Sequence, residues 1–80
     1  MTPNEIARVQ DYLRKVFAND KIVVDPPRKR GAPTEVRIGD EFLGVLDRDD
    51  EDGSVSYSLS IAILEEDLPA ASPVRGKRQP

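Results

Sequence analysis

The sequence predicts an α+β fold in which one N-terminal helix packs on one face of a four-stranded, mainly antiparallel sheet, in the order α-β-β-β-β. Three observations predict it: a capped amphipathic segment, a long run of alternating apolar and small polar residues, and an acidic turn between two extended segments. Eighty residues allow one domain with a thin stability margin. We expect a single domain over residues 1–69 and a disordered basic tail over residues 70–80.

The helix begins at a capping box. Thr2 can accept a hydrogen bond from the backbone of Glu5, whose side chain can reach back, and Pro3 suits the first helical position. Asn19 tolerates the left-handed conformation and is the expected stop. Between the cap and this stop, apolar residues recur with a 3.6-residue period. This period predicts one buried helix face made of Ile6, Val9, Leu13, Val16 and Phe17.

Three short extended segments follow the helix. Residues 21–25 form a strand that ends at two prolines, because proline cannot donate to a β-ladder. Residues 26–34 form a proline-rich basic loop, and residues 35–38 form the next strand. Gly39 and Asp40 suit a two-residue hairpin turn, after which residues 41–48 form the third strand.

The clearest pattern is the alternation over residues 55–63, where the odd-numbered residues are apolar and the even-numbered ones are serine or alanine. This period of two predicts a strand that buries its odd-numbered residues beneath the helix. Asp52 and Gly53 are a favoured turn pair for the hairpin that leads into it. Such a turn predicts three opposed pairs on the core face: Leu46 with Leu59, Gly44 with Ile61, and Phe42 with Ile63.

The second and third strands raise a conflict of register. A two-residue turn at residues 39–40 would put Val36 on the face opposite to Leu46, although both are expected in the core. A longer turn, or a bulge at Gly44, would restore a common face, and the sequence leaves these two solutions open. The expected core comprises Ile6, Val9, Leu13, Val16, Phe17, Ile22, Val24, Val36, Ile38, Phe42, Leu46, Val55, Tyr57, Leu59, Ile61 and Ile63.

The composition and the apolar segments indicate the cellular compartment of the protein. The chain has no cysteine, so neither a disulfide nor a thiolate metal site supports the fold, which suits a reducing compartment. No apolar run approaches the ~20 residues of a membrane span, and the N-terminus lacks a signal-peptide layout. The default expectation is a cytoplasmic protein that does not contact a membrane.

Several segments resemble a known family. They are Met1–Ile6, Val9-Gln10, Tyr12–Arg14, Asn19–Ile22, Ile38–Val45, Arg48–Gly53, Ser56-Tyr57 and Ala62–Leu64. Over roughly residues 1–68 the chain is similar to an uncharacterised group of small alphaproteobacterial proteins, classed as a domain of unknown function. The resemblance implies a bacterial, cytoplasmic origin. It implies no activity, cofactor or catalytic residue.

Catalysis is not expected. Histidine and cysteine are absent, which removes the commonest general base and the thiolate nucleophile. Ser56, Ser58 and Ser60 lie on an exposed strand face with no base to activate them, and paired carboxylates occur only in a mobile turn. We therefore predict no enzyme, no catalytic residue and no cofactor.

Two charged segments suggest weaker alternatives. Asp49, Asp50 and Asp52 could offer oxygen ligands to a divalent cation, but the EF-hand spacing is absent and a solvated turn is the simpler interpretation, so we predict no dedicated metal site. Basic residues in the loop and the tail could contact phosphates, although residues 35–69 are strongly acidic and would repel a nucleic acid. These basic candidates are Arg28, Lys29, Arg30, Arg75, Lys77 and Arg78.

The favoured function is a non-catalytic protein-interaction module, with another protein or a second copy as the partner. The motivation is that apolar residues lie on both faces of the third strand, beside a row of small serines. A domain this small also gains stability from an oligomeric partner. The candidate contact residues, on the sheet face away from the helix, are Leu43, Val45, Ser56, Ser58 and Ser60.

Overall fold

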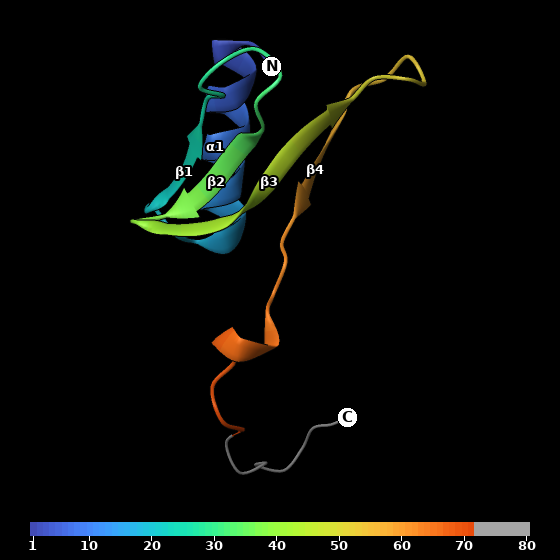
Figure 1. Cartoon of the computed structure of the whole chain (residues 1–80). Coiled ribbons are helices and arrows are strands. Elements are labelled where there is room, and N and C mark those ends of the chain that lie inside the picture. The colour runs from blue at the N-terminus through green and yellow to red at the C-terminus, as the bar shows by residue number, and fades with distance from the viewer. Residues whose placement is uncertain (72–80) are drawn as a thin grey trace.

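A computed structural model of the chain describes residues 1–71 and confirms the predicted α-β-β-β-β arrangement (Figure 1). The helix packs against one face of a four-stranded antiparallel sheet in which each strand neighbours the next along the chain. The elements are α1 (Pro3–Phe17), β1 (Ile22–Asp25), β2 (Thr34–Ile38), β3 (Glu41–Asp49), β4 (Ser56–Ser60) and the 3₁₀ turn η1 (Glu65–Asp67).

Helix α1 begins as its sequence predicts. The backbone N–H of Glu5 donates to Thr2 Oγ1 at 3.1 Å, and the backbone N–H of Thr2 donates to Glu5 Oε1 at 2.9 Å. The helix ends one residue earlier than expected, because Ala18, not Asn19, adopts the left-handed conformation with φ 52°. Asn19 instead uses its side-chain oxygen to accept from the N–H of Lys21, which shapes the short connection to β1.

A β-bulge resolves the register conflict between β2 and β3. The turn at residues 39–40 is short, as predicted, so Ile38 pairs with Glu41 and Arg37 pairs with Phe42. Val36 then pairs with Gly44, which leaves Leu43 as the extra residue of β3. The bulge restores Val36 and the following residues of β3 to a common face, but it turns Phe42 away from the core, so the expected burial of Phe42 is wrong.

The hairpin between β3 and β4 has the predicted register but a wider loop. Leu46 pairs with Leu59 as expected, and the last pair is Asp49 with Ser56. The side chain of Asp49 accepts from the N–H of Glu51, which turns the chain and ends the ladder before the expected two-residue turn. Gly53, with φ 82°, lies inside the resulting loop.

The core lies between α1 and the first three strands. Its buried apolar residues are Ile6, Leu13, Ile22, Val24, Val36 and Leu46, and Ile22 and Val36 are fully buried. A helix with its side chains is about 10 Å wide and strands are about 4.8 Å apart, so one helix covers about two strands. The helix-facing side of β4 is therefore largely left open.

This open side corrects several expectations. Tyr57 and Leu59 are only partly buried against the core, where full burial of the odd-numbered residues of β4 was predicted. The remaining errors are expected core residues that are exposed, namely Val16, Phe17, Phe42, Val55, Ile61 and Ile63. The pattern identified the correct strand face, but the single helix is too narrow to cover it.

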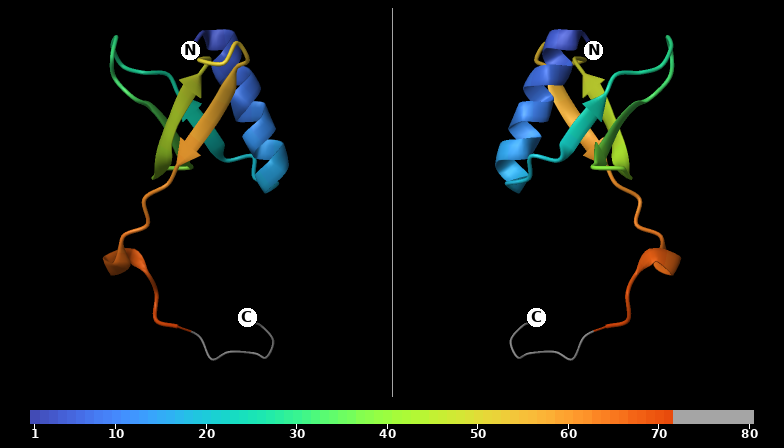
Figure 2. Two further views of the ribbon diagram at one scale, coloured as in Figure 1. Left: turned by 90° about the vertical axis from the view of Figure 1, so that its right-hand side faces the viewer. Right: turned by 90° about the vertical axis from the view of Figure 1, so that its left-hand side faces the viewer.

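Beyond β4 the chain leaves the body of the fold. Residues 61–71, here called the C-terminal arm, run away from the sheet past the end of β4 and contain η1 (Figures 1 and 2). The predicted disordered tail lies outside the described residues from position 72 onward. Within residues 1–71, no helix has the length and apolar content that crossing a membrane requires.

Candidate functional site

An apolar groove separates α1 from β4. Figure 2 shows the two elements diverging from the end that holds the start of the helix. The groove has a volume of about 430 Å³, and most of the surface that lines it belongs to carbon atoms. It is lined by Glu5, Arg8, Val9, Tyr12 and Leu13 of α1 and by Leu46, Tyr57 and Leu59 of the sheet. We refer to it as the α1–β4 groove.

A hydrogen-bonded cluster closes the narrow end of the groove. Glu5 Oε2 accepts from Arg48 Nε at 2.6 Å and from the hydroxyl of Tyr57 at 2.7 Å. Arg48 also donates to Asp50 at 2.9 Å, so the cluster links α1, β3, β4 and the acidic loop. Because Glu5 also forms half of the capping box, one carboxylate fixes the start of the helix and attaches it to two strands.

These contacts shift the proton affinities of the cluster. The backbone N–H of Thr2, the hydroxyl of Tyr57 and the guanidinium of Arg48 together lower the pKa of Glu5 to about 2. The hydrogen bond to Glu5 raises the pKa of Tyr57, and the same carboxylate raises the pKa of Arg48. The cluster therefore remains a carboxylate with two protonated donors at neutral pH, which suits a structural link rather than proton transfer.

The two edge strands of the sheet, β1 and β4, differ in whether helix side chains bond to their outer backbone groups. At the β1 edge, the N–H of Val24 donates to Gln10 Oε1 at 3.0 Å, and Arg14 Nε donates to the carbonyl oxygen of Ile22 at 2.7 Å. At the other edge, β4 has β3 as its one neighbour in the sheet that residues 1–71 form. The stretch from Val55 to Leu64 also contains no charge and no proline. It thus lacks the charged side chains and prolines that often protect an edge strand from pairing.

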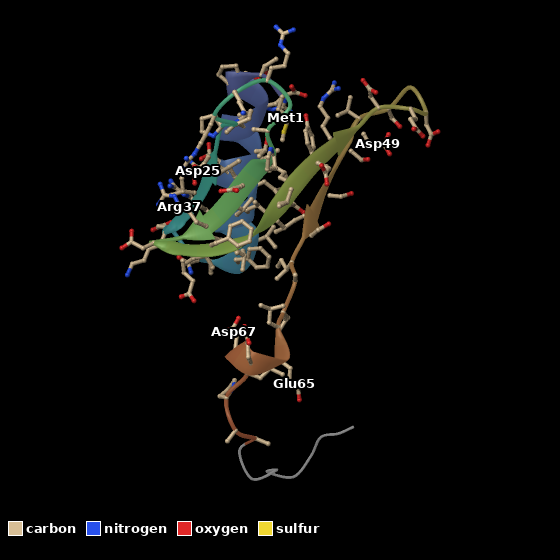
Figure 3. The ribbon with its side chains drawn as sticks, in the orientation of Figure 1. Met1, Asp25, Arg37, Asp49, Glu65 and Asp67 are labelled. Atoms are coloured by element: carbon tan, nitrogen blue, oxygen red, sulfur yellow. The ribbon has the colours of Figure 1, made fainter. Side chains whose placement is uncertain are left out.

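The C-terminal arm continues the apolar character of β4. Four large apolar residues of the arm, Ile61, Ile63, Leu64 and Leu68, are between 44% and 72% exposed. Figure 3 shows Glu65 and Asp67 of η1 far from the body of the fold. The arm therefore exposes several large apolar side chains close together, more than single scattered apolar residues on a protein surface.

The predicted contact face on the other side of the sheet is more polar than expected. Ser58 and Ser56 pair with Asp47 and Asp49, so carboxylates flank the serine row. Val45 lies on this face between Glu35 and Ser60. Leu43 does not belong to this face, because the bulge lets it pack against the core.

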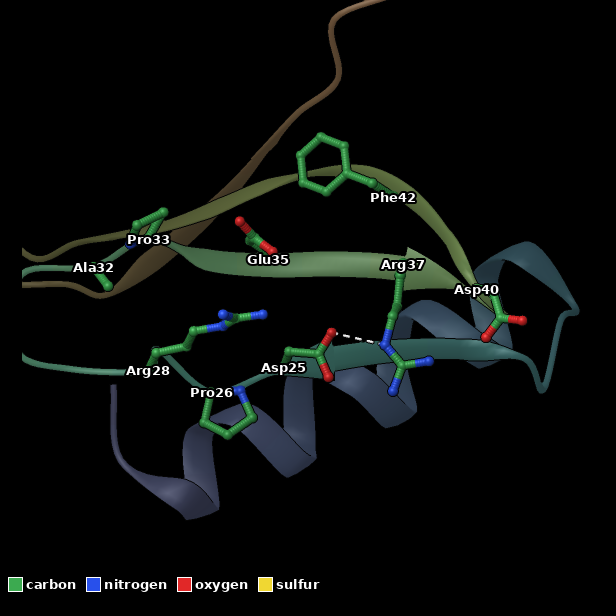
Figure 4. A pocket seen from close by; sticks show the side chains of 9 residues that line it. All are labelled: Asp25, Pro26, Arg28, Ala32, Pro33, Glu35, Arg37, Asp40 and Phe42. Atoms are coloured by element: carbon green, nitrogen blue, oxygen red, sulfur yellow. Dashed lines mark hydrogen bonds and ion pairs between the residues drawn. The ribbon is translucent and has the colours of Figure 1, made fainter.

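A polar cleft of about 550 Å³ lies on the same side of the molecule, between the basic loop and the sheet (Figure 4). Arg37 bridges its floor by donating to Asp25 at 2.8 Å and to the carbonyl oxygen of Gly39 at 2.6 Å. Arg28 extends across the cleft toward Glu35. Basic and acidic groups are thus interleaved, which leaves no uniform field for an anion or a cation.

The charged candidates are not gathered into one site within residues 1–71. Arg28, Lys29 and Arg30 are exposed in the loop between β1 and β2, and the predicted tail cations lie outside the described residues. In the acidic loop, Asp50 pairs with Arg48, and Asp49 accepts from a backbone N–H. The described residues hold no group of three or more acidic side chains placed to share a metal ion.

Sequence reasoning missed the residues that shape the groove. Arg8 and Tyr12 form its helical wall, and Arg48 joins Glu5 at its closed end. A signal for Arg48 existed, because it follows Leu46 by two residues and so shares the helix-facing side of β3. Its partner could not be found without the relative position of helix and strand.

A family model matches most of the chain. Residues 5–67 match the family model DUF3126, described as a protein of unknown function. No curated protein and no solved structure matches the chain. The matched region contains α1, except for its first two residues, together with the whole sheet and η1. The chain therefore belongs to the DUF3126 family.

Proposed function

We propose that this protein is a non-catalytic protein-interaction module that binds its partner through the α1–β4 groove and the adjoining strand β4. The observation that carries the proposal is that a single helix leaves the helix-facing side of β4 open, with Tyr57 and Leu59 on the floor and Tyr12 on the wall. Burying such apolar area is the main source of binding free energy between proteins.

The distribution of exposed apolar residues supports this surface over the opposite face. Tyr12 and Val16 are more than half exposed on the wall side of α1, and Ile61 and Ile63 are exposed beyond β4. The helix-free face instead carries Phe42 and Val45 among Asp25, Glu35 and Asp47. Charged residues are depleted at the centres of protein interfaces, so this face suits a contact less well.

We also propose that the protein acts in a bacterial cytoplasm, which the resemblance implies. The cysteine-free composition accords with a reducing compartment. The absence of histidine and cysteine supports the non-catalytic part of the proposal.

The test uses two matched variants of the full chain. Tyr12→Asp puts a charge on the groove wall, and Phe42→Asp puts the same charge on the helix-free face; both side chains are more than half exposed, so both variants should fold. Proteins captured by the tagged chain from a lysate of its own organism are purified, and their affinity for each variant is measured by calorimetry. We expect Tyr12→Asp to weaken binding at least about tenfold, and Phe42→Asp to leave it within about twofold.

Two results would overturn the proposal. In the first, the purified partner binds Tyr12→Asp as tightly as the original chain. In the second, the chain neither binds a captured protein directly nor associates with itself.

A further inference from the structure

We infer that the partner at β4 is a second copy of this chain, which pairs antiparallel with the first along the open edge and joins the two sheets into one of eight strands. This inference rests on the proposed function, since it names the occupant of the same open side. It differs from the dimer that the sequence suggested, because the contact runs along the strand edge and not across the helix-free face.

The outer edge of β4 has backbone groups that another strand could bond to. The backbone of β4 can form hydrogen bonds on both sides, and β3 satisfies one side only within the sheet of residues 1–71. Addition of a strand to such an edge satisfies the remaining N–H and C=O groups. The opposite edge cannot serve, because Gln10 and Arg14 already bond to β1 and two prolines follow it.

The sequence from Val55 to Ile63 is complementary to itself when it is reversed about Leu59. With a two-fold axis at Leu59, Val55 of one copy lies opposite Ile63 of the other, and Tyr57 lies opposite Ile61. On the other face, Ser56 lies opposite Ala62 and Ser58 lies opposite Ser60. Directly opposed residues share a face, so apolar side chains meet apolar ones and small side chains meet small ones.

In the proposed dimer, the first residues of the C-terminal arm extend the paired strand. Residues 61–63 extend past the end of β4 and have no strand partner within the described chain. In the dimer, Ile61 and Ile63 of each copy would lie beside Tyr57 and Val55 of the other and extend the apolar floor of the α1–β4 groove. Exposure of these side chains in the single chain is thereby explained.

The area available is adequate for a dimer that dissociates on dilution. Three large apolar side chains of the paired stretch are between 44% and 72% exposed: Val55, Ile61 and Ile63. Each leaves on the order of 100 Å² in water, or about 300 Å² per copy before the strand backbone and the half-buried Tyr57 and Leu59 are added. A standard interface takes about 800 Å² per partner, so this contact lies at the lower end of specific interfaces.

Cross-linking tests the pairing register, and the chain is well suited to it because it has no cysteine. Opposed residues in an antiparallel pair lie about 4.5–5.5 Å apart, which a disulfide can span. Ser58→Cys and Ser60→Cys variants of the full chain are mixed and oxidised; we expect a disulfide between one residue of each type, identified by mass spectrometry. Ser56→Cys alone is the control, because its two copies would lie six residues apart in register and should not cross-link.

Sedimentation velocity tests the association itself. Over about 1 µM to 1 mM, we expect the original chain to shift from monomer to dimer, and Ile63→Asp to weaken the dimer at least about tenfold. Phe42→Asp is the matched control and should dimerise normally. A monomer at every concentration, or cross-linking of Ser56→Cys as readily as of the Ser58→Cys and Ser60→Cys mixture, would overturn the second-copy inference.

The results separate this inference from the proposed function. If the chain stays monomeric while a captured protein requires Tyr12, the interaction module stands and the second copy is excluded. If the chain cross-links in the expected register while Tyr12→Asp changes no association, the dimer stands and the role of the groove in binding is excluded.

Discussion

The two edge strands of the sheet differ in whether side chains form hydrogen bonds with their outward backbone groups. At β1, side chains of α1 occupy these positions: Gln10 accepts from Val24, and Arg14 donates to Ile22. At β4, an uncharged stretch from Val55 to Leu64 faces outward with no such cover in residues 1–71.

The difference follows from connectivity. A short connection of residues 18–21 joins α1 directly to β1, so the helix must pack near that strand. A helix of this width covers about two strands, so the fourth strand, which Glu5 reaches through the hydroxyl of Tyr57, is otherwise left largely uncovered. A four-stranded sheet with one helix is thus asymmetric by construction, and its open side is where a partner would contribute most.

The largest expected effect separates the covered half from the open half. Leu46 is 4% exposed and Ile63 is 72% exposed. Leu46→Ala should lower the free energy of unfolding by about 2–5 kcal/mol, because it leaves a cavity beneath the helix. Ile63→Ala should change it by less than about 0.5 kcal/mol at concentrations where the chain is monomeric. Urea denaturation measures both, and similar losses in the two variants would contradict the asymmetry.

A second variant should weaken the pairing of β4 with β3 and leave the rest of the sheet intact. A Cβ at Gly44 would collide with the backbone carbonyl of Ser60, which cannot move without disrupting the ladder between β3 and β4. Gly44→Ala should therefore cost about 1–3 kcal/mol. Amide exchange should accelerate in β4 while the amides between β1 and β2 keep their protection. Uniform acceleration across all four strands would show that β4 is integral to the core.

A third variant should remove a side-chain hydrogen bond from the outer edge of β1. Gln10→Ala removes the acceptor for the N–H of Val24, which lies in a buried residue. We expect a loss of about 1–2 kcal/mol in the free energy of unfolding, since a buried donor loses its partner. Asp11→Ala, at an exposed position of the same helix, serves as the control and should change little. Equal stability of Gln10→Ala and the original chain would mean that water replaces the glutamine without cost.

The smallest expected effect concerns pH. Glu5 has its pKa lowered from 4.5 to about 2, so its folded state favours the carboxylate, and the stabilisation it provides is complete above about pH 4.5. It should disappear as the pH falls toward 2. The difference in urea midpoint between the original chain and Glu5→Gln should therefore shrink over this range. A difference that stays constant with pH would contradict the contacts assigned to Glu5.

Much of the local structure follows from the sequence because it depends on neighbours in the chain. The capping box of Thr2 and Glu5, the turn at residues 39–40 and the pairing of Leu46 with Leu59 are all confirmed. Each depends on residues that are adjacent in sequence or joined by one hairpin. The proposed interaction surface and its residues remain predictions.

Features that depend on distant residues were predicted less well. The face of Phe42 depends on the bulge at Leu43, which adjusts β3 to β2. The sequence offered a bulge at the neighbouring Gly44 but could not choose it over a longer turn. Exposure of Ile61 and Ile63 depends on where β4 ends and the chain leaves the body of the fold, which a pattern of alternation does not contain. The contact between Glu5 and Arg48 joins residues 43 positions apart, and only the packed arrangement reveals it.

The location of the core along the chain has a consequence for biosynthesis. Within residues 1–71, every buried apolar side chain lies at or before Leu46. The N-terminal part of a chain leaves the ribosome first, so a nascent polypeptide can bring these buried side chains together before β4 and the arm have emerged. Strand β4 and the arm would then be added last, to a body whose core is already formed. If two chains pair through β4, as we propose, they would meet only after each had formed its own core.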